Sequence, residues 1–148
     1  MRSVFSSCIL LVSLTLISFN AWSAVGRILI FEGDVRVNGE QVTSETQLNQ
    51  EDTIATGPDS SVTIVLADNS VLDLDGNSEI AIRDYNFDAS MPEDNNSDIG
   101  VLAGTLRYVS GKIAKDDPDN VSFSAGTSTI GVRGTFISIS VCPDEGCN

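Results

Sequence analysis

The glycines around the segment TSTIGVRGTFISIS, residues 127 to 140, have a spacing that could bind phosphate. Gly126 and Gly131 match the G-x-x-x-x-G start of a P-loop. A P-loop continues with Lys and then Ser or Thr, which contact the phosphates and magnesium, whereas this chain has Val132 and Arg133. A strand also follows instead of a helix, so no helix N-terminus is available to bind an anion. The pattern argues against a nucleotide site and favours a structural corner.

Histidine is absent from the 148-residue chain, and this excludes most hydrolytic chemistry. Ser-His-Asp and Cys-His catalytic groups and histidine-ligated metal sites all require it. The chain has 21 acidic residues, so some pair of neighbouring carboxylates is almost inevitable and says little about acid–base catalysis. We therefore expect a protein that is not an enzyme, with no catalytic residues and no cofactor.

The segment DLDGN, residues 73 to 77, has some features of a calcium-binding loop. When Gly76 is placed at the sixth position of the EF-hand pattern, Val71 falls at the first position and Ile82 at the twelfth, where carboxylates are required. The two aspartates are two residues apart, so on a strand both would lie on the outward face. We interpret the segment as a solvated turn and expect no metal site.

The first 23 residues have the organisation of a secretory signal peptide. Arg2 precedes an apolar run from residue 8 to residue 19, and the small residues of Ala21-Trp22-Ser23 favour cleavage ahead of Ala24. The run is about a dozen residues long, well short of the roughly 20 that span a bilayer. We expect residues 1–23 to be removed and the protein to be periplasmic or secreted; lipidation of Cys8 is a minor alternative with a poor motif match.

The mature chain would be strongly acidic. It would have 125 residues, enough for one domain with its own core, which we place at residues 24–141. Seven basic and 21 acidic side chains would give it a formal charge of −14. Such a charge disfavours nucleic-acid binding, which depends on Lys and Arg, and favours either general solubility or an acidic patch for a basic partner.

Two cysteines lie near the C-terminus, in a tail at residues 142–148. Cys142 and Cys147 enclose the segment PDEG, and in an oxidising compartment they are predicted to close a small disulfide loop. A zinc site would need two further ligands that the mature chain lacks. A redox couple remains an alternative, although nothing nearby provides the electropositive surroundings that activate a thiolate.

The mature sequence has the period-two alternation of short strands almost throughout. Asn38-Gly39 predicts a type I′ hairpin within residues 35–42. Ser60, Ser70 and Ser78 each begin the pattern Ser-x-apolar-x-apolar, with turns at Asp68-Asn69 and Gly76-Asn77. These spacings are typical of a meander, a β-sandwich or a β-solenoid. We predict an all-β fold, either a short-strand solenoid or a sandwich.

One segment interrupts this alternation. Residues 84–98, DYNFDASMPEDNNSD, are acidic and contain Pro92, so we expect an exposed, mobile acidic loop. Strand character resumes at residues 99–111 and 121–125 and again after Gly134. No amphipathic helix of ordinary length is predicted.

Four segments in register resemble the FecR-type periplasmic domain. TSTIGVRGTF is similar to the Gly-Val-Arg-Gly-Thr signature that closes that domain, and three upstream segments follow in the family's order: EDTIATG (51–57), VTIVLADNSVLDL (62–74) and LAGTLRYVSGKIAK (102–115). Glu51, Asn69 and Ala125-Gly126 depart from the family pattern, each by a turn-type substitution. The chain has no room for the cytoplasmic segment and membrane helix of FecR-type signalling proteins, so we expect the exported domain alone, without their transmembrane regulatory activity.

The resemblance assigns roles within the corner formed by Gly131, Val132, Arg133, Gly134 and Thr135. We expect the two glycines to permit a sharp turn and Val132 to enter the core. Arg133 is predicted to lie across neighbouring loops as a structural pin, because its planar guanidinium can satisfy a carboxylate and carbonyl oxygens together.

The functional expectation is an exported, non-enzymatic FecR-like module that acts in binding or signalling through protein or glycan contact. The alternative is a structural component of the envelope whose acidic face associates through divalent cations or basic partners. The partner and the oligomeric state stay open, since exposed strand edges could pair between copies.

Overall fold

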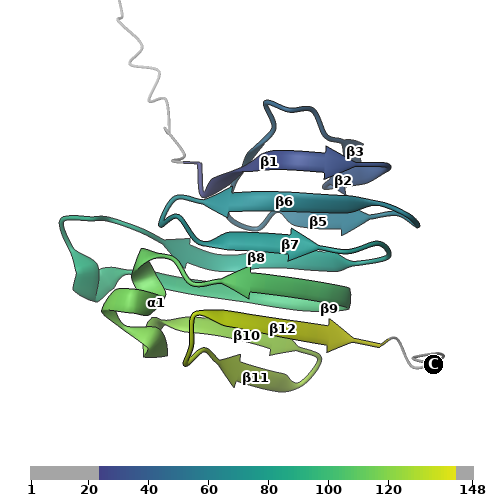
Figure 1. Ribbon diagram of the computed structural model, residues 1–148. Helices are drawn as coiled ribbons and strands as arrows, with labels where there is room; N and C mark the ends of the chain where they lie inside the picture. The colour runs from purple at the N-terminus through teal and green to yellow at the C-terminus, as the bar shows by residue number, and fades with distance from the viewer. Residues whose placement is uncertain (1–23, 143–148) are drawn as a thin grey trace, which may run out of the picture.

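The computed structural model describes residues 24–142 as a stack of short strands (Figure 1). Three short helical segments accompany them, α1 (Lys112–Asp116), η1 (Pro92–Asp94) and η2 (Pro118–Asn120). No helix in this range is long and apolar enough to cross a membrane. The strands are β1 (Gly26–Glu32), β2 (Val35–Val37), β3 (Glu40–Gln41), β4 (Gln47–Leu48), β5 (Thr53–Thr56), β6 (Ser61–Leu66), β7 (Val71–Leu74), β8 (Glu79–Asn86), β9 (Asn96–Val109), β10 (Val121–Ala125), β11 (Ser128–Gly131) and β12 (Phe136–Val141).

The strands form one curled 12-stranded sheet whose two halves face each other (Figure 1). The front half has the order β4-β1-β6-β7-β9-β12, and the back half has the order β3-β2-β5-β8-β9-β10-β11. The long strand β9 belongs to both, because its first part pairs with β8 and β10 and its second part with β7 and β12. Every pair is antiparallel except β9–β10. The all-β prediction is confirmed.

The core fills the space between the two halves. Val62 and Ile64 of β6 alternate with half-buried residues and are fully buried, as are Leu72 and Leu74 of β7. The back half contributes equivalent residues such as Ile82 of β8. Burial of each such side chain stabilises the fold by about 1.5–3 kcal/mol. The period-two pattern of the sequence therefore identifies the inward face of these strands correctly.

The serines that begin the three repeated patterns are buried and bind the turns. Ser60 Oγ accepts the backbone N–H of Asp34 at 2.9 Å, and Ser78 Oγ accepts that of Thr105 at 2.9 Å. The first contact joins two turns that are distant in the sequence, and the second joins the start of β8 to the middle of β9. The three patterns are not successive neighbours, however: β6 pairs with β7, whereas β8 crosses to the back half and pairs with β5 and β9.

The hairpin at Asn38-Gly39 is confirmed, with both residues at positive φ between β2 and β3. The segment 84–98 differs from the expected loop. Its ends extend β8 and β9, and Tyr85 pairs with Ser97 in a register that continues to Asn86 and Asn96.

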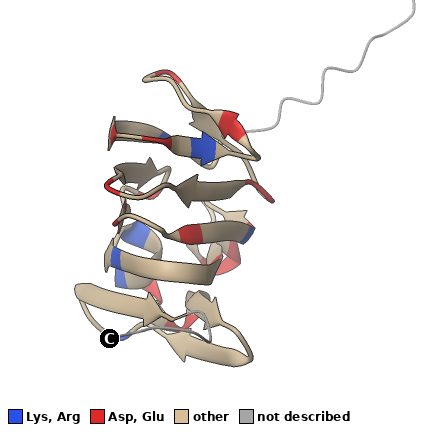
Figure 2. Ribbon diagram, turned by 90° about the vertical axis from the view of Figure 1, so that its right-hand side faces the viewer, with Lys and Arg blue, Asp and Glu red and all other residues tan. Residues whose placement is uncertain are grey.

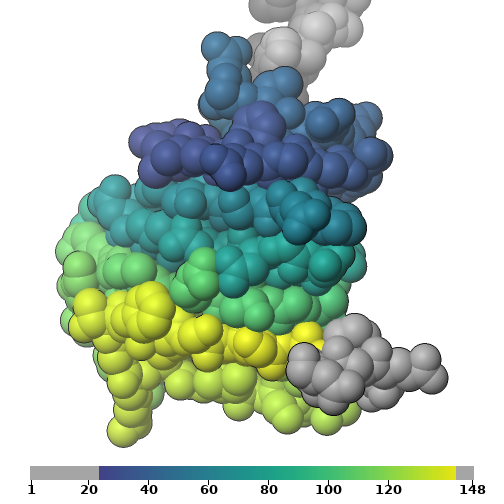
Figure 3. Space-filling model, turned by 45° about the vertical axis from the view of Figure 1, so that its right-hand side comes forward, coloured from purple at the N-terminus to yellow at the C-terminus, as the bar shows by residue number. Residues whose placement is uncertain are grey.

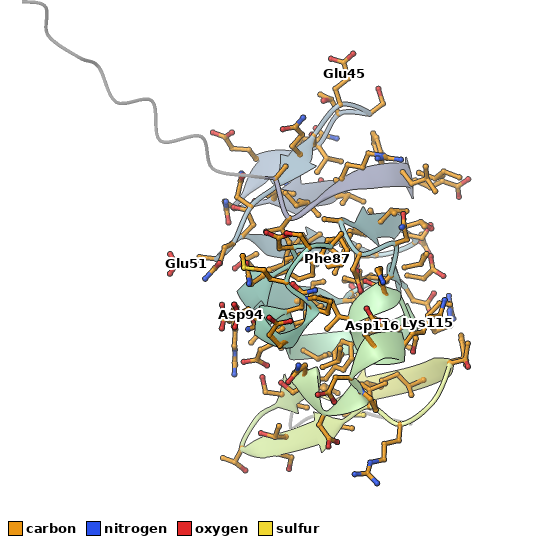
Figure 4. All side chains as sticks on the ribbon, turned by 90° about the vertical axis from the view of Figure 1, so that its left-hand side faces the viewer. Glu45, Glu51, Phe87, Asp94, Lys115 and Asp116 are labelled. Carbon is orange, nitrogen blue, oxygen red and sulfur yellow. The ribbon has the colours of Figure 1, made fainter. Side chains whose placement is uncertain are left out.

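The connection between these strand ends is short and is held by side-chain hydrogen bonds. The side chain of Asn95 accepts the backbone N–H of Asp88 at 2.6 Å and donates to its carbonyl at 3.1 Å. Phe87 packs against the core while Asp94 projects outward (Figure 4). The acidic residues therefore lie at the end of a hairpin. The strands extend this far because Tyr85 and Phe87 pack against the core.

The two ends of the stack are closed differently. At the end that carries β1, the segment 42–50 covers the core, and its own side chains Val42 and Leu48 are buried. The backbone N–H of Val25 donates to the Leu48 carbonyl at 2.7 Å, which holds this segment in place. At the opposite end, β11 pairs only with β10 and β12 only with β9 within residues 24–142. We call this end, formed by β11, β12 and the corner 131–135 that joins them, the open end.

Candidate functional site at the open end

The edge of β12 carries main-chain groups that no described strand uses. Ser110 donates its backbone N–H to the Thr135 carbonyl at 3.0 Å, and Asp75 donates to the Thr105 carbonyl at 3.2 Å. Along an antiparallel pair, residues whose main-chain groups bond to the other strand alternate with residues whose groups point away from it. The first bond places Thr135 among the residues that bond towards β9. The second shows that Thr105, which lies opposite Ser140, directs its carbonyl away from β12. Phe136, Ser138 and Ser140 therefore direct their N–H and C=O groups away from β9.

Apolar side chains gather beside this edge. Phe136 is 60% exposed and lies opposite Val109, itself partly exposed, on the outer face of the front half. Ile130 of β11 is also exposed. On the inner face, Ile137 and Val141 are only half-buried although they pack against the core. Residues of this kind at an open edge are typical of a contact surface.

The open end lacks charge in its strands. Neither β11 (STIG) nor β12 (FISISV) contains a charged residue, and Figure 2 shows the strands at this end in tan. Figure 3 shows β12, in yellow, running across this end of the molecule. Lysines, prolines, bulges and inward charges normally protect an edge strand from pairing, and β12 has none of these.

The corner 131–135 joins β11 to β12. Val132 is 1% exposed, so its predicted entry into the core is found. Ser110 anchors the end of the corner, because its Oγ donates to the Gly134 carbonyl at 2.5 Å. Gly131 and Gly134 do not have positive φ, and a Cβ at either would meet no atom within 4 Å. The turn itself therefore does not demand glycine at these positions.

The side chain of Arg133 is exposed and does not act as the predicted structural pin. Its side chain is 82% exposed, and its Nη2 forms a 3.4 Å ion pair with Oδ1 of Asp119, which is also exposed. Exposed pairs of this kind contribute about 0–1 kcal/mol. The guanidinium extends from the open end instead of holding loops together, because the buried Val132 beside it directs the neighbouring side chain outward.

Arg107 has the binding geometry that was expected of Arg133. Its two terminal nitrogens contact both carboxylate oxygens of Asp75, at 2.6 and 3.0 Å. The pair joins β9 to the turn after β7, so Asp75 is more than a solvated turn residue. The sequence contains a signal for it, since Arg107 lies in the segment LAGTLRYVSGKIAK that resembles the family.

Asp68 is a buried carboxylate that the sequence identifies only as a turn residue. Its side chain accepts the Ser70 hydroxyl at 2.6 Å, the Tyr85 hydroxyl at 3.1 Å and the Ile113 N–H at 3.2 Å. Burial, and then the negative charge of Asp68, raises the pKa of Tyr108 to about 12 and also raises the pKa of Tyr85. These contacts connect the β6–β7 turn to β8 and α1. The arrangement is structural, because the carboxylate oxygens are already bound.

The end that carries β1 has a groove with a volume of about 630 Å³. Arg27 and Glu45 are its charged lining residues, and Glu45 projects beyond the stack in Figure 4. Among residues 24–142 no three Cys, Asp or Glu side chains are grouped so that they could hold a metal ion. Cys147 lies outside the described residues, so its pairing with Cys142 stays a prediction.

These features define an all-β domain with a contact edge that is unpaired among residues 24–142. A family model described as FecR protein matches residues 52–146, which is more than half of the chain. The chain belongs to the FecR family. FecR proteins are signalling regulators and not enzymes, so the domain is a signalling-related module. No curated protein and no solved structure matches the chain.

Proposed function

We propose that the protein is an exported FecR-domain module that acts without catalysis, by binding another protein in the periplasm through its open end. The observation that carries the proposal is the outer edge of β12, the edge away from β9, which is uncharged and pairs with no strand of residues 24–142, with Phe136 exposed beside it. Export is supported by the signal-peptide pattern of residues 1–23.

The chemistry of this edge favours protein over glycan as the ligand. Phe136, Ser138 and Ser140 offer a repeated series of main-chain donors and acceptors, which an extended polypeptide can match by adding a strand to the sheet. The adjacent apolar side chains then provide contacts that select the partner. A glycan would instead require clustered polar side chains, and β11 and β12 contribute only serine and threonine hydroxyls.

Capture from a periplasmic extract tests this function. The mature protein would carry a tag at Ala24, at the end of the stack that lies away from β12. Wild-type protein is expected to retain one partner in stoichiometric amount. Phe136→Lys is expected to lose it, because the charge would be placed in the contact surface.

Ile30→Lys is the matched control. Ile30 is 62% exposed on β1, so the same substitution is made at a similarly exposed residue far from the open end. Equal capture by wild type and Phe136→Lys would contradict the proposal. A diffuse set of proteins released by a chelator would instead support a scaffold held by the acidic surface.

A further inference from the structure

We propose that β12 pairs antiparallel with β12 of a second copy of this chain, across a two-fold axis at Ser138. The inference rests on the proposed function to the extent that both place a contact surface at the open end. It goes beyond that function, because a second copy would occupy the same edge when no other protein is bound there, and because it specifies the register.

Within residues 24–142, β12 is the longest regular strand with one edge unpaired. β3 and β4 have two residues each, and β11 has four. The outer edge of β1 beyond Ile28 pairs with no described strand, but the register of β1 shifts between Ile28 and Ile30. A bulge of this kind twists an edge away from further pairing. β12 has six residues in unbroken register with β9.

The alternation of β12 restricts how two copies can pair. Ile137, Ile139 and Val141 face the core, and the other three residues face outward. Directly opposed residues in an antiparallel pair share a face, so outward residues must oppose outward residues. This condition requires the two-fold axis to pass through a residue and not between two residues.

The main-chain groups select which residue lies on the axis. With the axis at Ser138, Phe136 opposes Ser140 of the second copy and Ser138 opposes its own equivalent. Every outward-directed N–H and C=O of both strands then has a partner. An axis at Ile139 would leave Phe136 opposite Cys142, beyond the end of the strand, and would lose part of this pairing.

The second copy would also complete the core at the open end. Ile137 would oppose Ile139 of the second copy on the inner face, where Ile137 and Val141 are otherwise half-exposed to solvent. Removal of this apolar surface from water favours association by about 25 cal/mol per Å².

Charge permits this contact although the chain has a formal net charge of −13. The paired strands carry no charge themselves. The charges of the two copies are therefore not brought together at the contact itself.

Substitutions at Ser138 test the axis directly, because only a two-fold pair places residue 138 opposite itself. The mature wild-type protein is expected to dimerise with rising concentration in light scattering coupled to size exclusion. Ser138→Lys and Ser138→Glu, each alone, are expected to raise the dimer Kd at least about tenfold through like-charge repulsion. An equimolar mixture of the two variants is expected to recover the dimer. Ser138→Thr should dimerise as wild type does.

Circular dichroism checks that each variant is folded, and folding is expected because the Ser138 side chain is exposed on the outer face of the sheet. A monomeric wild type at all concentrations would overturn the proposal, as would a dimer unaffected by either charge at position 138. Loss of the dimer in Ile30→Lys would indicate head-to-tail contact through β1 and would also overturn it. The assay uses purified protein alone, so a missing dimer with normal capture of a periplasmic partner contradicts this inference and leaves the proposed function standing.

Discussion

Removal of the Asp68 carboxylate is expected to destabilise the fold strongly. Its carboxylate accepts hydrogen bonds from Ser70, Tyr85 and Ile113 while remaining 2% exposed. Asp68→Ala would leave these buried donors without an acceptor. We expect the free energy of unfolding to fall by about 3 kcal/mol or more, measured by urea titration.

Asp73→Asn is a suitable control for this change. Asp73 lies nearby on β7, is only half-buried and accepts a single hydrogen bond from Thr63. Its substitution is expected to cost less than about 1 kcal/mol. Equal effects of the two substitutions would show that the Asp68 contacts do not stabilise the fold as described.

The two tyrosines of the chain give the protein a defined response to alkaline pH. Tyr85 and Tyr108 are both buried. Burial, and then Asp68, raises the pKa of Tyr108 from 10.0 to about 12, and the pKa of Tyr85 is raised for the same reasons. A raised pKa means that the folded state holds the phenol proton more tightly than the unfolded state. Stability is therefore complete below about pH 10 and is lost as the pH rises towards about 12.

Each tyrosine is expected to contribute a slope of up to about 1.4 kcal/mol per pH unit in this window. Tyrosinate absorbance and circular dichroism, followed together, provide the measurement. Both signals should change at the same pH, above about 10. Tyrosinate formation near that pH in a protein that is still folded would contradict the burial of these two side chains.

Two arginines are predicted to contribute unequally to stability. Arg107→Ala removes a two-point contact to the half-buried Asp75, and we expect a loss of about 1 kcal/mol. Arg133→Ala removes one long, exposed contact, and we expect a change within about 0.5 kcal/mol. Thermal unfolding of both variants provides the comparison. A larger effect for Arg133 would restore its interpretation as a pin.

At the scale of elements, β9 makes the two halves of the sheet into one body. Gly104 lies where its pairing changes from β8 and β10 to β7 and β12, and it has φ +77°. An added Cβ would overlap the side chain and backbone of Ser78. We expect Gly104→Ala to lower the free energy of unfolding by roughly 3 kcal/mol, through backbone strain and overpacking together.

Gly126→Ala separates the cost of backbone strain at positive φ from the cost of steric overlap with Ser78. Gly126 also has positive φ, but a Cβ added there would meet no atom within 4 Å. Its substitution is expected to cost about 1 kcal/mol. Similar losses for both glycines, measured by urea unfolding, would mean that the close approach of Gly104 to Ser78 does not matter.

The elements that the sequence predicts well are those whose alternation is local. Strands β6, β7 and β8, the Asn38-Gly39 hairpin and the apolar face of β12 follow from period two and turn chemistry. The loop predicted at residues 84–98 is shorter in the structure, where only residues 87–95 lie between the strands. Acidic residues and Pro92 dominate the sequence pattern and conceal the strand character of Tyr85. Nothing in the sequence places Tyr85 beside Asp68, and that contact explains why this hairpin is ordered.

The candidate site is predictable only in part. The corner 131–135 and its buried Val132 follow from the resemblance of TSTIGVRGTF to the family signature. The two-point contact expected of Arg133 is made by Arg107, for which the sequence predicts no role, because an ion pair such as Arg107–Asp75 depends on strand register across β7 and β9. Likewise, the free edge of β12 among the described strands depends on the order of the strands in the sheet. The side-chain alternation within one strand carries no information about that order.

At the scale of the whole molecule, the stack is closed at one end and open at the other. The segment 42–50 covers the core beside β1, while β11 and β12 end the sheet without a cover among the described residues. Because the chain belongs to the FecR family, we interpret this difference between the two ends in terms of a signalling-related role. We infer that the surface available for strand addition is the part of the domain that recognises another polypeptide.

Backbone amide exchange along β12, measured by NMR, tests this most directly. In the monomeric Ser138→Lys variant, the amides of Ile137, Ile139 and Val141 should be protected by β9, and those of Phe136 and Ser140 should exchange fast. In concentrated wild-type protein, or with a captured partner bound, Phe136, Ser138 and Ser140 are expected to become protected. Fast exchange at these three amides under every condition would show that the edge of β12 is not the contact surface.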